Sequence, residues 1–240
     1  MPRFGTWPEI GVAAILERLD QDTLSGEDMS SLAHPQAGYD TTEVPIIVRG
    51  SLKLGLAEAL IVAAIGLVSR FLDGPVEIAL EGVILAFGVL LVVGLPGIWT
   101  RARTIEGIAG AAGIGLGATG VFLVLDLLFL QGNLFPALYT NRWKEIGGGS
   151  NWWYHPVWWM VGTYLSWLGG WILANQTRKS GAPSLPGLAI LLGICTVVCG
   201  VIAVVVKFPG AGWNVPTFGV AVLPGLALAT TISVLGARKA

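Results

Sequence analysis

The chain has 240 residues, of which 54% are hydrophobic and only 12% are charged, and its mean hydropathy is +0.73. Soluble domains carry about 25% charged residues, so this composition indicates a protein whose body lies in lipid. The formal net charge of −1 excludes the strongly basic character by which many proteins bind nucleic acid.

Residues 1–47 are predicted to form an acidic cytoplasmic tail, because they hold eight of the chain's fifteen Asp and Glu residues. Thr6 and Glu9 have the spacing of a capping box at the start of a short helix over about residues 7–20. The apolar residues of this helix recur with helical spacing, and they are Val12, Ile15, Leu16 and Leu19. Since its other face is acidic, we expect this helix to dock on a partner or on the protein's own cytoplasmic face. A helix lying on the bilayer is the alternative, although such helices usually carry basic residues.

Residues 48–240 are predicted to form an all-α polytopic membrane domain of six transmembrane helices. Each apolar stretch is close to the roughly 20 residues that a helix needs to cross a hydrocarbon core of roughly 30 Å. The six stretches are 52–72, 76–98, 105–130, 157–175, 186–206 and 215–236. They leave no room for a second folded domain.

Lys and Arg residues near the helix ends predict the orientation. Eight lie on the side of both termini: Arg49, Lys53, Arg101, Arg103, Arg178, Lys179, Arg238 and Lys239. Four lie on the other side: Arg70, Arg142, Lys144 and Lys207. Because short cytoplasmic loops are rich in basic residues, we expect both termini to be cytoplasmic. The expected location is a cell membrane, specifically a bacterial inner membrane.

The outer loop 131–156 and the start of the fourth span are unusually aromatic. Loops longer than about 12–15 residues are commonly functional or disordered. The large rings in question are Trp143, Trp152, Trp153, Tyr154, Trp158 and Trp159. They are expected to form either an aromatic belt at the membrane surface or a contact surface for another subunit, since Trp and Tyr dominate interface energies.

Small residues predict where the helices pack. Gly110, Gly113, Gly117 and Gly120 lie on one face of the third span, and such faces let helix backbones approach closely in membranes. Asp126 is expected on the opposite face, together with Thr119.

Acidic residues inside the spans are the candidate site, since an ionisable group at mid-bilayer costs at least about 2.5 kcal/mol. In one hypothesis, Glu58, Glu81 and Asp126 bind a cation, a proton or a basic substrate. In the other, which we favour, these acids form structural ion pairs. Glu58 would then pair with Lys53 or a neighbouring helix, and Glu77 and Asp126 would pair with Arg70, Arg142 or Lys144.

The sequence predicts no haem or metal ligated within the bundle. Its histidines are His34 in the tail and His155 outside the bundle, and its cysteines are Cys195 and Cys199 in one span. Haem and zinc sites need more histidine or cysteine ligands than that. Cofactors are otherwise left open, including contact with a lipid, a quinone or a pigment.

Three functions fit these observations. The first is a non-catalytic integral subunit of a larger membrane complex, such as an electron-transfer or light-harvesting assembly, whose partners are membrane lipids and other membrane subunits. The second is a small secondary carrier or a substrate-binding transport subunit that uses the intramembrane carboxylates. The third, a membrane enzyme acting on lipid or quinone, has the least support, because the carboxylates lie on different helices with no nucleophile beside them. We prefer the first.

Overall fold

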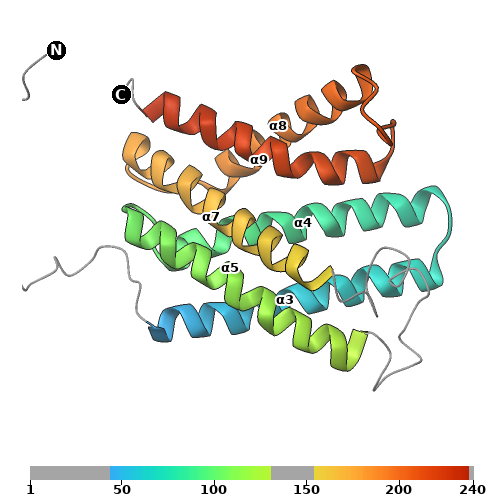
Figure 1. Ribbon diagram of the computed structural model, residues 1–240, viewed down its shortest axis with the longest axis horizontal. Helices are drawn as coiled ribbons and strands as arrows, with labels where there is room; N and C mark the ends of the chain where they lie inside the picture. Colours follow the sequence, from blue (N-terminus) through green and yellow to red (C-terminus); the bar gives the residue numbers. More distant parts are fainter. Residues whose placement is uncertain (1–43, 131–153, 238–240) are drawn as a thin grey trace, which may run out of the picture. The chain divides into compact units, whose positions relative to one another are not determined.

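The computed structural model describes residues 44–130 and 154–237, and all regular secondary structure within those two ranges is helical. Figure 1 shows the helices coloured along the chain. They are α3 (Val44–Phe71), α4 (Pro75–Trp99), α5 (Ile105–Leu125), the π-helix η1 (Asp126–Leu130), α7 (Tyr154–Ser180), α8 (Leu185–Val205) and α9 (Val215–Ala237).

Five helical segments are long and apolar enough to cross a membrane: α3, α4, the continuous α5–η1 segment, α8 and α9. Each has at least the roughly 20 residues that a span requires. The predicted all-α class and the presence of membrane-spanning helices are therefore confirmed.

The fourth expected span, 157–175, lies within α7, which is not one of these five segments. With 27 residues α7 is long enough to span, but polar side chains lower its hydropathy. These are Thr163, Tyr164, Ser166, Asn175 and Gln176. Length and composition thus support five spans, and α7 as a sixth is a prediction.

The first membrane helix begins earlier than the sequence pattern predicts. α3 starts at Val44, so residues 44–47 belong to a helix and not to the tail. Pro45 falls in the first turn, where its missing N–H costs no helical hydrogen bond. The prediction was wrong because it placed the boundary beside Arg49 and Lys53, whereas a helix can continue past the edge of the hydrocarbon core into the headgroup region.

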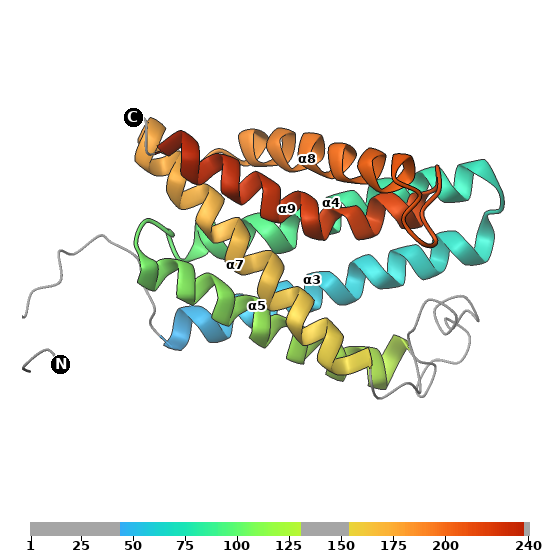
Figure 2. The same ribbon diagram turned by 45° about the horizontal axis from the view of Figure 1, so that its top comes forward.

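α7 is the central helix among those described. It packs against α5, α4 and α9, and Figures 1 and 2 both show it between α5 and α9. α3 packs against α5 and α4, while α8 packs mainly against α9. Fully buried residues from all six described α-helices share one core, among them Leu54, Ile114, Leu173 and Leu188. Since α7 has protein on several sides, its polar side chains can face other helices and not lipid.

Glycines allow close approach at two of these contacts. A Cβ atom on Gly169 of α7 would collide with the backbone carbonyl of Val93 in α4. A Cβ atom on Gly55 of α3 would lie 2.6 Å from the carbonyl oxygen of Ala118 in α5. Lipid tails are as apolar as the side chains they touch, so helices in a membrane associate chiefly through such tight packing.

The predicted packing face of the third span is confirmed at its centre. Gly117 lies against Ser51 of α3, and the Cβ position of Gly113 is 3.7 Å from the Ile47 side chain. Ser51 Oγ also donates a hydrogen bond to the carbonyl of Ile114 over 3.3 Å. This face of α5 therefore packs on α3.

A hydrogen bond from α7 completes the backbone of α4. Pro96 lies inside α4 and has no N–H, so the carbonyl of Val92 lacks its usual helical donor four residues later. Ser166 Oγ donates to that carbonyl over 3.0 Å, in a buried contact. In a membrane such a freed carbonyl is satisfied by a neighbouring helix.

Replacing Ser166 with alanine is expected to lower the free energy of unfolding by about 1–2 kcal/mol, because it leaves a buried carbonyl without its donor. Denaturant unfolding of the purified protein in detergent, followed by tryptophan fluorescence, measures the change. The control is Ser180→Ala, which removes an exposed hydroxyl bonded to Gln176 of the same helix and should leave stability unchanged. Equal losses in both variants would contradict this role of Ser166.

The helix ends form two groups with different charge. The start of α3, the α4–α5 and α7–α8 connections and the end of α9 lie at one end, on the left of Figure 1. We call it the basic end. Its described basic residues are Arg49, Lys53, Arg101, Arg103, Arg178 and Lys179, and its described acidic residue is Glu106. The described basic residues toward the opposite end are Arg70 and Lys207.

Candidate functional site

Glu58 lies at the middle of α3, on the face that meets the bundle. It follows the fully buried Leu54 by four residues, and residues four apart share a helix face. Gly55, on one side of this face, lies against α5, while Ile61, on the other side, lies against Gly88 of α4. Glu58 is therefore partly buried and faces the region between α4 and α5.

Glu81 lies in the first half of α4, on the face that meets α3. It lies four residues after Glu77 and seven before Gly88, positions that share one face of a helix. Gly88 contacts Ile61 of α3, and Glu77 is only 2% exposed. Glu81 itself is only partly buried, so part of its side chain remains accessible at the surface of the described helices.

Neither Glu58 nor Glu81 makes a hydrogen bond or an ion pair with another residue that the structure describes. The Glu58–Lys53 pair favoured by the sequence is therefore not formed. A charged group in the middle of a membrane helix costs about 2.5–3.5 kcal/mol. These two carboxyl groups consequently call for a proton, a cation or a donor from beyond the described helices.

Asp126 is fully buried and begins the π-helix η1. Seven residues earlier on the same face, Thr119 lies against Gly162 of α7, whereas Gly117 lies against α3. This confirms that Thr119 lies opposite the glycine face, and the spacing of seven residues predicts that Asp126 shares its face. The π-helix η1 itself packs against α5 and α3. Short π-helical turns often mark functional sites, and nothing in the sequence pattern predicted this one.

The three predicted carboxylates lie on three different helical segments. Glu58 and Glu81 face the region shared by α3, α4 and α5, while Asp126 is buried at the start of η1. Among the described residues, no group of three or more His, Cys, Asp or Glu side chains is placed to hold a metal ion. Each carboxyl can act singly, by accepting a proton or by binding one cation or hydrogen-bond donor.

Most residues of the two predicted partner surfaces lie outside the described part of the chain. These are Val12, Ile15, Leu16 and Leu19 in the tail, and Trp143, Trp152 and Trp153 in the outer loop. Tyr154 and Trp158 fall in the first turns of α7. Trp159 is 49% exposed, which suits both an aromatic belt and a partner contact. Both roles stay predictions.

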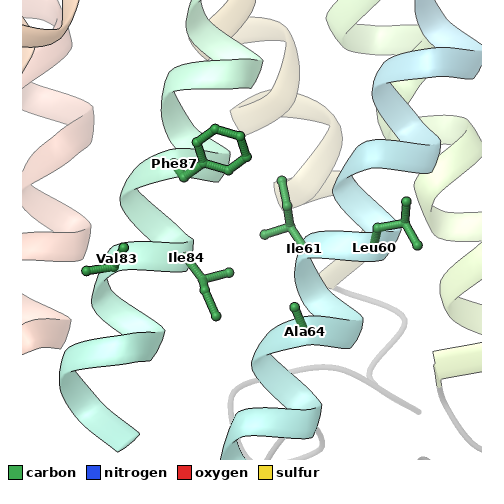
Figure 3. Close-up of a pocket in the computed structure, with 6 residues that line it drawn as sticks. All are labelled: Leu60, Ile61, Ala64, Val83, Ile84 and Phe87. Atoms are coloured by element: carbon green, nitrogen blue, oxygen red, sulfur yellow. The ribbon is translucent and has the colours of Figure 1, made fainter. Parts of the chain in front are cut away.

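An open apolar groove of about 380 Å³ lies between α3 and α4. Figure 3 shows Ile61 of α3 and Ile84 of α4 pointing toward each other across it. The remaining lining residues are Leu60, Ala64, Val83 and Phe87. No polar side chain lines this groove, so it suits the hydrocarbon chain of a membrane lipid.

No protein-family model matches the chain, and no curated protein and no solved structure is significantly similar to it. Any proposal for the function of the chain therefore rests on its own residues.

Proposed function

We propose that the chain is a non-catalytic integral subunit of a larger membrane protein complex, for example an electron-transfer or light-harvesting assembly in a bacterial inner membrane. In this proposal α7 is the sixth span and both termini are cytoplasmic. The central position of α7 supports a span whose polar residues face protein. The concentration of Lys and Arg at the basic end supports the orientation.

The observation that carries the proposal is the lack of described partners for Glu58 and Glu81. Both are only partly buried, so a side chain of a neighbouring membrane subunit can reach them. A Lys, an Arg or a hydroxyl on that subunit would offset the cost of placing a carboxylate in lipid. Acidic side chains in two membrane helices would then fix which subunit binds and in which orientation.

The decisive experiment is extraction from native membranes in mild detergent, followed by a native gel, mass spectrometry and an absorbance spectrum of the band. The proposal expects the chain to migrate with other polypeptides in fixed ratio. The spectrum then shows whether the assembly carries haem or pigment. A lone species of 25.2 kDa, or a simple homo-oligomer, would contradict the proposal.

Removal of residues 1–43 is expected to release the partner while leaving α3, which starts at Val44, and the rest of the bundle folded. Replacing all four apolar residues of the predicted tail helix with serine should have the same effect: Val12, Ile15, Leu16 and Leu19. Leu24→Ser, outside that helix, is the control and should retain the partner. Co-purification on a C-terminal tag measures this. Full retention by the truncated chain would exclude docking by the tail.

A small secondary carrier or a substrate-binding transport subunit is the second candidate. It is favoured by the buried Asp126 at the start of η1, together with Glu58 and Glu81 inside the apolar helices. A carrier would load a cation, a proton or a basic substrate on such carboxylates. Uptake into liposomes that contain the purified chain alone would support this function over the first.

A further inference from the structure

The basic end of the bundle carries a pocket that the proposed function does not use. Its volume is about 310 Å³, within the range of small-ligand sites. Arg103 lines it from the α4–α5 connection, and the end of α7 and the turn that follows supply the other wall. The residues of that second wall are Ala174, Thr177, Arg178 and Gly181.

Packing beneath the pocket holds its two walls together. Ala102, the residue before Arg103, and Ala174 belong to one small buried cluster with Ile108 of α5. The connection that carries Arg103 is thus fixed to the helix that carries Arg178. Two arginines from separate elements consequently line one cavity.

The electrostatic environment of the pocket favours an anion. Arg178 makes no hydrogen bond or ion pair with another described residue, so its donors are available. Free carbonyls at a helix C-terminus disfavour anions, but two carbonyls near this end of α7 already accept hydrogen bonds. Thr177 Oγ1 donates to Leu173, and the N–H of Gly181 donates to the Thr177 carbonyl.

We propose that this pocket binds a phosphate group between Arg103 and Arg178. The planar guanidinium matches phosphate with two parallel hydrogen bonds. The pocket lies where membrane-spanning helices end, which is the level of lipid headgroups. An anionic phospholipid headgroup is the expected source of the phosphate, and a soluble phosphate compound carries the same chemistry. The proposal does not rest on the chain being a subunit or a carrier.

The test compares two double variants of the full-length protein that lose the same charge. R103Q/R178Q removes both guanidinium groups of the pocket. R101Q/K179Q removes two basic side chains at neighbouring positions that do not line it. Native mass spectrometry of the delipidated protein, titrated with phosphatidylglycerol, gives the affinity of each. We expect the pocket variant to bind phosphatidylglycerol about tenfold more weakly or worse, because it loses hydrogen bonds to a charged group. The control should lose much less affinity.

Equal weakening of the two double variants would overturn the proposal, since it would indicate general attraction to a basic surface. Unchanged binding by the pocket variant would also overturn it. Inorganic phosphate is the second probe. If it displaces the lipid and raises the Tm of the lipid-free wild type but not of R103Q/R178Q, the phosphate site stands and its ligand is soluble. Circular dichroism verifies that each variant keeps its helices.

Discussion

Alanine at Gly169 is expected to destabilise the protein by about 3 kcal/mol or more, at the upper end of what overpacking a helix contact costs. The added Cβ would collide with the carbonyl oxygen of Val93 and lie 2.7 Å from its carbonyl carbon. Val93 is fully buried in the shared core. Backbone atoms cannot rotate away as a side chain can, so α4 and α7 would have to separate.

The measurement is equilibrium unfolding in detergent, and the matched control is Gly193→Ala in α8. Among the described residues, nothing lies within 4 Å of the Cβ position of Gly193. The control should therefore leave stability unchanged, or raise it by at most about 1 kcal/mol through better helix propensity. A Gly169→Ala protein as stable as its control would show that α4 and α7 do not pack at this distance.

Replacement of Glu58 with methionine is expected to stabilise the isolated protein by about 2 kcal/mol while weakening its function. Methionine has a similar length and adapts to irregular space, and it removes the cost of a carboxyl group in an apolar helix. Glu106→Met at the basic end is the control. Glu106 is exposed in the first turn of α5, where loss of an acidic side chain costs about 0.3–1 kcal/mol, so this control should not gain stability.

The two candidate functions differ in what else Glu58→Met loses. For a membrane subunit, the variant should co-purify with less of its partner. For a carrier, it should stop uptake by the chain alone in liposomes, and Glu81→Gln should act in the same way. A less stable Glu58→Met protein would contradict both, because it would mean that Glu58 is satisfied within its own bundle.

Several boundaries of the fold followed from the sequence alone. The predicted spans 76–98, 186–206 and 215–236 correspond to α4, α8 and α9, whose ends differ from them by a single residue at most. In lipid, each helix must satisfy its own backbone hydrogen bonds, so the length of an apolar run determines a span without reference to its neighbours. The glycine face of α5 was predictable for a similar reason, since helical periodicity alone places Gly113 and Gly117 together.

What each helix contacts was decided only by the tertiary structure. The hydrogen bond from Ser166 to the Val92 carbonyl joins residues 74 positions apart, and no local pattern relates them. Arg103 and Arg178 are 75 positions apart in the sequence, and only helix packing places them around one pocket. Glu58 was expected to pair with Lys53 or a neighbouring helix, but it pairs with no other described residue. Hydropathy reports how a residue interacts with lipid, whereas these features depend on which protein surface replaces the lipid.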